Sequence, residues 1–176
     1  KKLKIFEPKL KEECGIFGIS NAKDASALAA LGLHALQHRG QEAAGIVTFD
    51  GEHFHTHRAL GLVGDNFNEP KVVQKLKGSI GIGHVRYATT GETILRNVQP
   101  LFAEFKFGGL AVAHNGNLTN ARRLRAKLIE RGCIFQSTMD TETIVHLIAR
   151  SEYGKVVDRL VDSLRQVQGA YSLVAM

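Results

Sequence analysis

One cysteine and three polar motifs contain the residues of this sequence that are best suited to chemistry. Cys14 lies where the charged run KLKEE gives way to the apolar run CGIFGIS. The motifs are HVRYATTG at 84–91, AHNGNL at 113–118 and STMDTE at 137–142. A thiol can attack an amide carbonyl as a nucleophile, although a free cysteine at the start of an apolar strand is also a common core residue. We therefore asked whether the motifs supply the other groups that such an attack needs.

Each motif offers a group for one part of that reaction. The planar guanidinium of Arg86 matches a carboxylate, and Asp140 supplies an anion at the start of a predicted helix. Asn115 brings an amide donor and Gly116 a backbone N–H without a side chain, and two such donors can stabilise an oxyanion. Singly, each residue has an ordinary structural explanation as an ion-pair partner, turn residue or helix cap. Together with a thiol, they form a set that could bind an amino acid at both ends and hydrolyse its amide.

Two further groups of reactive side chains favour structural roles. His53, His55 and His57 alternate along one predicted strand and so face one side, but the outer two lie ~13 Å apart, too far to share one zinc ion. We interpret them as the polar outer face of a hairpin; the alternative is a metal-binding pair with a third ligand from elsewhere. Cys133 follows a helix beside apolar residues and is interpreted as a buried structural thiol. The sequence therefore predicts no metal site.

The elements that must position these groups are strands and helices joined mainly by short turns. The sequence predicts strands at 14–20, 79–89 and 170–176, and hairpins at 43–60 and 100–116. The first hairpin should turn at Asp50–Gly51 in a type I′ turn, and the second near Gly108–Gly109. Helices are predicted within 21–40 (with Asp24 as N-cap and Gly40 as stop), 69–78, 120–132, 139–154 and 155–169. Hairpins rather than parallel crossovers predict antiparallel sheets covered by helices, an α+β layered fold.

The composition is that of a globular domain with an ordinary core. The 176 residues are 44% hydrophobic and 23% charged, with a net charge of +6. No apolar run approaches the ~18 residues of a membrane span, and no basic stripe with interleaved aromatics indicates nucleic-acid binding. Two cysteines without a secretory signal predict a reducing, cytoplasmic location. Residues 1–13 hold five lysines and three glutamates and read as a leader rather than a core element.

The motifs CGIFGI, LQHRGQEAAGI, GHVRYATTG, AHNGNLTNA and STMDTET together resemble the class II glutamine amidotransferases, from Cys14 to Met176. The segment QHRGQE is most similar to the branch of the family that passes ammonia to phosphoribosyl pyrophosphate in the first committed step of purine synthesis. The resemblance implies an N-terminal-nucleophile hydrolase fold, a four-layer αββα sandwich, with L-glutamine as substrate. The alternatives are the hexosamine-forming branch, or a non-catalytic relative that binds glutamine.

The resemblance also implies roles for individual residues by position. Cys14 would be the nucleophile, and Asn115 with Gly116 would form the oxyanion hole. Glutamine would be held by Arg86 at its α-carboxylate and by Asp140 at its α-amino group. Arg39 would support the cysteine, and Tyr87 and Thr89 would line the pocket.

The sequence departs from the family pattern at both ends. Thirteen residues precede Cys14, whereas active members begin at the cysteine, so we expect 1–13 to be a propeptide and 14–176 to be the glutamine amidotransferase domain, incomplete at its C-terminus. The resemblance implies that a phosphoribosyltransferase domain would follow Met176, and phosphoribosyl pyrophosphate, Mg²⁺ and any iron–sulfur cluster would belong to that domain. No cofactor is therefore assigned to this chain, and a homo-oligomer is expected.

The chemistry of the thiol explains why Cys14 should become the first residue. A thiol with a pKa near 8.5 is mostly protonated at neutral pH and needs a base. An N-terminal cysteine has its own base, because its α-amine has a pKa of about 7.7–8.0. While Glu13 is attached, the same nitrogen is an amide that cannot accept a proton. We therefore expect the unprocessed chain to be inactive, and the Cys14 thiol to release the leader autocatalytically.

Overall fold

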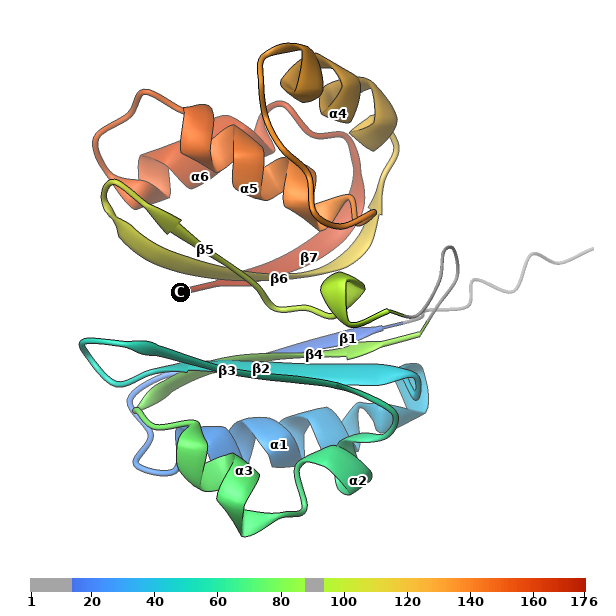
Figure 1. Cartoon of the computed structure of the whole chain (residues 1–176), viewed down its shortest axis with the longest axis vertical. Coiled ribbons are helices and arrows are strands. Elements are labelled where there is room, and N and C mark those ends of the chain that lie inside the picture. The colour runs from blue at the N-terminus through green and yellow to red at the C-terminus, as the bar shows by residue number, and fades with distance from the viewer. Residues whose placement is uncertain (1–13, 88–93) are drawn as a thin grey trace, which may run out of the picture.

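Two antiparallel sheets lie face to face in the centre of the molecule (Figure 1). The structure is a computed structural model and describes residues 14–87 and 94–176. The first sheet has the strand order β1 (Gly15–Ile19), β4 (Ile80–Arg86), β2 (Ala43–Phe49), β3 (Phe54–Leu60). The second has the order β5 (Leu101–Phe105), β6 (Gly108–Leu118), β7 (Gly169–Ala175). All neighbouring strands are antiparallel, as the sequence predicted.

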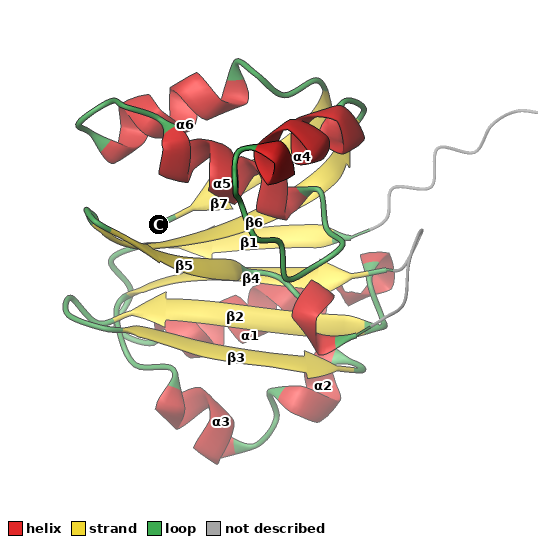
Figure 2. Cartoon of the chain, turned by 45° about the horizontal axis from the view of Figure 1, so that its top comes forward, coloured by secondary structure: helices red, strands yellow, loops and turns green. Residues whose placement is uncertain are grey.

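Helices cover the outer face of each sheet (Figures 1 and 2). The first sheet is covered by α1 (Ala25–Ala35), α2 (Val63–Asn66) and α3 (Pro70–Lys75). The second is covered by α4 (Ala121–Glu130), α5 (Thr141–Arg150) and α6 (Val156–Leu164). The result is the predicted four-layer αββα sandwich, and none of the helices described is long and apolar enough to cross a membrane.

The apolar core fills the three spaces between these four layers. Leu33 of α1 packs with Val85 under the first sheet, and Ile144 of α5 packs with Val112 above the second. Between the sheets lie Val47, Ile82, Ala111 and Ala113. Side chains alternate along a strand. His84 and Arg86 follow Ile82 on β4 by two and by four residues, so they also face the space between the sheets. That alternation brings polar side chains of β4 into the interior of the sandwich.

The two hairpins differ in how closely their turns match the sequence prediction. Phe49 pairs with Phe54, so the first loop spans four residues, and the predicted two-residue type I′ turn at Asp50–Gly51 is wrong. The Asp50 carboxylate accepts the N–H groups of Glu52 and His53 at 2.9 and 2.7 Å, which stabilises the longer loop. The second hairpin turns at 106–107, directly before the predicted glycines.

The first helix also ends differently from the prediction. It stops at Ala35, and a short 3-10 turn at Gln37–Arg39 follows it. Gly40 has extended backbone with φ −160°, so it does not terminate the helix in the left-handed conformation. Asp24 occupies the N-cap position but makes no capping hydrogen bond with its side chain. The remaining predicted helices and strands are present, with ends that differ by a few residues.

Candidate active site

Cys14 lies directly before β1, where two hydrogen bonds fix its backbone. Gly15 pairs with Val85 in the antiparallel ladder, so Cys14 lies opposite the end of β4. The N–H of Cys14 donates to the Arg39 carbonyl at 2.9 Å, and Arg39 Nε donates to the Cys14 carbonyl at 2.8 Å. Cys14 has φ +72°, in the left-handed region that residues other than glycine rarely adopt. Such strained positions concentrate at functional sites.

The Cys14 sulfur lies against the backbone of Tyr87. The Tyr87 N–H donates to Sγ at 3.4 Å, and the Tyr87 carbonyl oxygen lies 3.6 Å from Sγ. The carbonyl can accept a hydrogen bond from the thiol S–H, whereas the N–H can donate one to a thiolate. The Tyr87 side chain is 40% exposed. Thr89, the other residue expected to line the pocket, lies outside the described residues.

Arg86, the last residue of β4, is a buried cation that meets no carboxylate among the described residues. It is 3% exposed. Its guanidinium donates to the Asn97 carbonyl at 3.3 Å and lies 2.8 Å from the Met139 sulfur. Its Nε has no hydrogen-bond partner. Because a buried charge without a counter-ion is costly, this position suits an anionic ligand.

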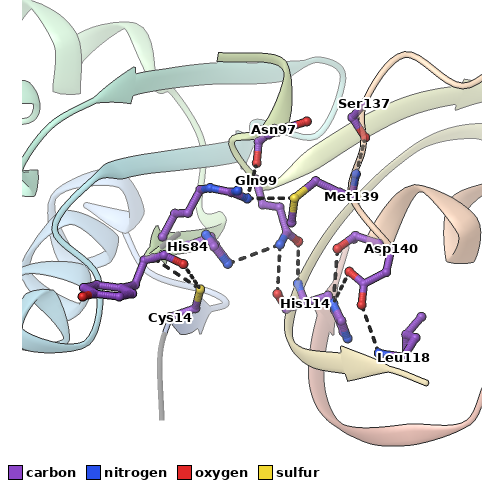
Figure 3. Close-up of polar contacts among 12 residues, drawn as sticks. Cys14, His84, Asn97, Gln99, His114, Leu118, Ser137, Met139 and Asp140 are labelled. Atoms are coloured by element: carbon purple, nitrogen blue, oxygen red, sulfur yellow. Dashed lines mark hydrogen bonds and ion pairs between the residues drawn. The ribbon is translucent and has the colours of Figure 1, made fainter. Parts of the chain in front are cut away.

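Asp140 directly precedes α5, a helix that covers the second sheet, and its neighbour Met139 contacts Arg86 of the first sheet. The Asp140 side chain does not cap that helix, so the alternative role as a helix cap is excluded. Its Oδ2 accepts the Leu118 N–H at 3.0 Å, and Oδ1 lies 3.6 Å from Nδ1 of His114 (Figure 3). Because Met139, the residue before Asp140, contacts the Arg86 guanidinium across 53 residues of sequence, the fold brings the segments that carry a cation and an anion side by side.

Asn115 and Gly116 lie near the C-terminal end of β6. Ala111 and Ala113 face the first sheet, and by alternation Asn115 faces it too. Gly116 has φ +140°, and a Cβ there would lie 2.3 Å from the Ala170 carbonyl oxygen, so only glycine fits. Asn115 and Gly116 thus lie near the end of β6, a strand of the second sheet whose inner face packs against the first sheet.

Sequence analysis missed a buried polar chain between the two sheets (Figure 3). The Gln99 side chain accepts the His114 N–H at 2.8 Å and donates to the His114 carbonyl at 3.0 Å. Its Nε2 also lies 3.3 Å from Nε2 of His84. Burial, assisted by the charge of Arg86, lowers the pKa of His84 to about 3, so this imidazole is neutral. The only sequence signal was a pair of amides in the otherwise apolar segment NVQPLF.

Asn97 was also not singled out from the sequence. Its side chain connects the segment that carries Gln99 to the loop before α5. Its Nδ2 donates to the Thr138 hydroxyl at 3.0 Å, and its Oδ1 accepts the Thr138 N–H at 3.1 Å. The Glu142 carboxylate holds the same loop by accepting hydrogen bonds from the backbone N–H groups of Gln136 and Ser137, each at 2.8 Å. Residues 136–138, which lead into Asp140, are therefore held by both Asn97 and Glu142.

The hairpin histidines and Cys133, to which the sequence assigned structural roles, make contacts away from Cys14, Arg86 and Asp140. His55 pairs with the Asp50 carboxylate at 2.6 Å, and the His57 ring packs edge-on against Phe67 at 5.2 Å. The prediction of a polar outer face is wrong for His57, which contacts the helical layer. Cys133 is half-buried against the core under α4 and α5 rather than fully buried. Within residues 14–87 and 94–176, no three His, Cys, Asp or Glu side chains gather in a way that could hold a metal ion.

Comparison with known sequences gives consistent matches. A family model described as a glutamine amidotransferase domain matches residues 84–176, more than half of the chain. The chain is 60% identical over 167 residues to amidophosphoribosyltransferase of Rhizobium etli. It is 48% identical over 168 residues to the enzyme of the same name from Bacillus subtilis. Both alignments cover 95% of this chain but only 34% and 35% of those proteins. The chain therefore spans about a third of the length of these curated relatives.

Comparison with solved structures agrees with the sequence matches. A structure described as the allosteric regulatory enzyme of purine biosynthesis has a TM-score of 0.87 and 46% identity. The match covers 92% of this chain and 35% of that one. The B. subtilis glutamine phosphoribosylpyrophosphate amidotransferase in complex with ADP and GMP has a TM-score of 0.85 and 45% identity, covering 92% of this chain and 34% of that one.

Proposed function

This chain belongs to the glutamine amidotransferase domain family, and from that premise we propose that it hydrolyses L-glutamine as part of an amidophosphoribosyltransferase. The observation that carries the proposal is the convergence of the buried Arg86 and the acidic Asp140 close to the end of the sandwich where Cys14 lies. A cation and an anion on neighbouring segments of one site suit the α-carboxylate and α-amino groups of one amino acid. The amidophosphoribosyltransferase names of the relatives favour phosphoribosyl pyrophosphate over a hexose phosphate as the ammonia acceptor.

The proposed reaction starts from the thiol of Cys14. The α-amine of Cys14 takes the thiol proton, and Sγ attacks the side-chain carbonyl carbon of glutamine. The resulting oxyanion accepts hydrogen bonds from the Asn115 side chain and the Gly116 N–H. The amine returns its proton to the departing nitrogen, ammonia leaves, and water hydrolyses the thioester to give glutamate and the free thiol. In the whole protein, the ammonia would replace pyrophosphate on phosphoribosyl pyrophosphate and form 5-phosphoribosylamine.

The mechanism requires a free amine, so residues 1–13 have to leave. These residues lie outside the described part of the chain. In the proposed release, the Cys14 thiol attacks the Glu13 carbonyl, the peptide nitrogen leaves as the amine, and water hydrolyses the thioester to a Glu13 carboxylate and a free thiol. The Arg39 carbonyl, which accepts the Cys14 N–H, is placed to hold the new amine by the same nitrogen.

The other components belong to the proposed whole protein. We propose that Mg²⁺, phosphoribosyl pyrophosphate and any iron–sulfur cluster are bound by the part of the relatives that this chain does not match. We also propose a cytoplasmic homo-oligomer. No step of glutamine hydrolysis in this chain depends on a metal or cluster.

Glutamine hydrolysis by the form that starts at Cys14 tests the proposal. We expect equal amounts of glutamate and ammonia to form, and no product from a Cys14→Ala variant. Addition of phosphoribosyl pyrophosphate and Mg²⁺ to the whole protein should yield pyrophosphate in step with glutamate. A correctly folded Cys14-first protein that binds glutamine without hydrolysing it would instead identify a non-catalytic relative.

A further inference from the structure

The segment that leads from the first sheet into the second, residues 94–100, is here called the sheet linker. Its central residues Asn97, Val98 and Gln99 are at most 1% exposed. Two polar side chains are thus completely buried on either side of Val98. Buried amides are costly unless their hydrogen bonds are satisfied, so the partners of Asn97 and Gln99 indicate what the linker holds in place.

Gln99 holds the strand that carries the two expected oxyanion-hole residues. Its side chain bonds both the N–H and the carbonyl of His114, as a neighbouring strand would. The regular ladder between β5 and β6 ends where Leu101 pairs with Val112, so the Gln99 amide continues it by side-chain bonds. The next residues along β6 are Asn115 and then Gly116.

Gln99 is equally fixed to the first sheet. Because its Oε1 accepts from His114, its Nε2 is the donor, and the 3.3 Å contact makes Nε2 of His84 the acceptor. Both of its N–H groups and its carbonyl oxygen are then engaged. A Cβ on Gly45 would lie 2.2 Å from the Gln99 carbonyl oxygen, so the linker backbone lies directly on β2. Gln99 therefore sets the position of β6 relative to β4, the strand that ends in Arg86.

Asn97 holds a different part of the site. Its side chain makes two hydrogen bonds to Thr138, the second residue before Asp140. Its carbonyl accepts a hydrogen bond from the Arg86 guanidinium at 3.3 Å. Asn97 thus contacts both segments expected to bind the ends of glutamine, and its two side-chain hydrogen bonds to Thr138 lie on the Asp140 side of the site.

We propose that Gln99 and Asn97 are positioning residues with separate tasks in glutamine hydrolysis. Gln99 fixes the backbone that carries Asn115 and Gly116, and therefore acts on turnover. Asn97 fixes the loop that carries Asp140, and therefore acts on glutamine binding. The proposal rests on the proposed function, because it uses the roles assigned there to these groups.

Steady-state kinetics separate the two tasks. Gln99→Met removes all three side-chain hydrogen bonds at similar volume, and we expect kcat to fall by about 10²-fold with KM within about threefold of the parent. Asn97→Ala should raise KM for glutamine by about tenfold with kcat within about threefold. Two milder variants, Gln99→Asn and Thr138→Val, should shift the same constants in the same directions by less, and they serve if the first pair fails to fold.

Hydrogen exchange gives a readout that does not depend on activity. Gln99→Met should accelerate amide exchange in peptides covering 112–118, and Asn97→Ala in peptides covering 136–141. Arg58→Met is the matched control, since Arg58 donates to the carbonyl of Val98 at 3.2 Å, between the two amides. It should leave kcat, KM and both exchange rates within about twofold of the parent.

The outcomes distinguish this proposal from the proposed function. If the Cys14-first parent releases no ammonia, the proposed function fails, and the exchange pattern alone decides whether the linker positions these two segments. If both variants lower kcat and raise KM together, or accelerate exchange equally in both segments, the linker is a general structural support and the proposal is wrong. The same holds if Arg58→Met reproduces either effect.

Discussion

Cys14 and Arg39 form two reciprocal hydrogen bonds, in which each residue donates once and accepts once. The Cys14 N–H donates to the Arg39 carbonyl at 2.9 Å, and Arg39 Nε donates to the Cys14 carbonyl at 2.8 Å. Together they stabilise the left-handed backbone of Cys14, at φ +72°, which leaves its sulfur beside Tyr87. The nitrogen that the proposed mechanism uses as a base thus has a fixed position.

Substitution of Arg86 should weaken glutamine binding. Breaking a buried ion pair by removing one partner costs about 3–5 kcal/mol, so Arg86→Leu should raise KM for glutamine by more than about 10²-fold. Arg86→Lys should restore part of the affinity, because it keeps the charge but loses the planar fork. Arg58→Leu is the control, since Arg58 is a cation on β3 whose guanidinium donates to the Val98 carbonyl. A KM for Arg86→Leu within about twofold of the parent would refute the assignment.

Substitution of Asn115 should lower turnover rather than binding. A donor used mainly in the transition state contributes about 10²–10³ in kcat, so Asn115→Ala should lose that factor with little change in KM. Asn117→Ala is the control, because Asn117 is an exposed residue two positions further along β6. Equal losses in kcat and binding would indicate a collapsed strand instead of a lost oxyanion donor.

The stability of the fold should fall as the pH decreases below about 6.5, the pKa of a histidine in an unfolded chain. Burial lowers the pKa of His84 to about 3 in the folded protein, so the unfolded chain binds this proton first. Linkage then predicts a loss of about 2 kcal/mol from this residue between about pH 7.5 and pH 5. Burial also lowers the pKa of His57, His114 and His146, which adds in the same direction.

Urea unfolding at about pH 7.5 and pH 5 checks this prediction. His84→Gln keeps an acceptor for Gln99 but cannot be protonated, so its stability should depend less steeply on pH than that of the parent. The comparison uses the change with pH within each protein, and is therefore insensitive to any constant cost of the substitution. Identical pH dependence in both proteins would contradict a neutral buried His84.

The histidines of the first hairpin should be dispensable for hydrolysis. Changing His53, His55 and His57 together to Gln should leave glutamine turnover and the metal content of the purified protein unchanged. The paired His55 and Asp50 are partly exposed, and exposed pairs of this kind contribute little to stability. Loss of a stoichiometric metal from the triple variant, measured by elemental mass spectrometry, would show that the hairpin binds one.

The sequence predicted the parts of the structure that depend on local patterns. Apolar runs between turn residues identified the strands, and helical apolar spacing identified the helices except for the short α2 (Val63–Asn66), which was not predicted. The turn at Asp50 was mispredicted because the register is set by packing of Phe49 against Phe54, with ring centroids 4.6 Å apart, and by a side-chain turn at Asp50. Short-range turn preferences do not include either contact.

The supporting residues of the site depend on contacts between distant segments. Asn97 meets Thr138 across 41 residues, and Gln99 meets both His84 and His114 across 15. Only the stacking of the two sheets creates these neighbours, so no spacing in the sequence indicates them. The reactive groups themselves, such as Cys14, are recognisable because they lie in motifs whose chemistry restricts the residue type.

The last prediction concerns the removal of residues 1–13. In the whole protein with its leader, intact mass should show the loss of 1–13, and a Cys14→Ala variant should keep them, because the thiol is the proposed nucleophile for release. Arg39→Met should slow the release, since it removes the Nε donor to the Cys14 carbonyl. Ser79, whose carbonyl accepts the Ala22 N–H far from this contact, provides a control as Ser79→Ala.

Glutamine hydrolysis should appear only in molecules that begin at Cys14. A form translated as Met-Cys, with the methionine removed, supplies that N-terminus without any leader and should be active from the start. An acetylated N-terminus on the same form should abolish turnover while leaving glutamine binding intact, because the acetylated nitrogen is an amide and cannot take the thiol proton. Full activity in a chain whose mass shows Lys1 still attached would disprove both the inhibitory leader and the amine as base.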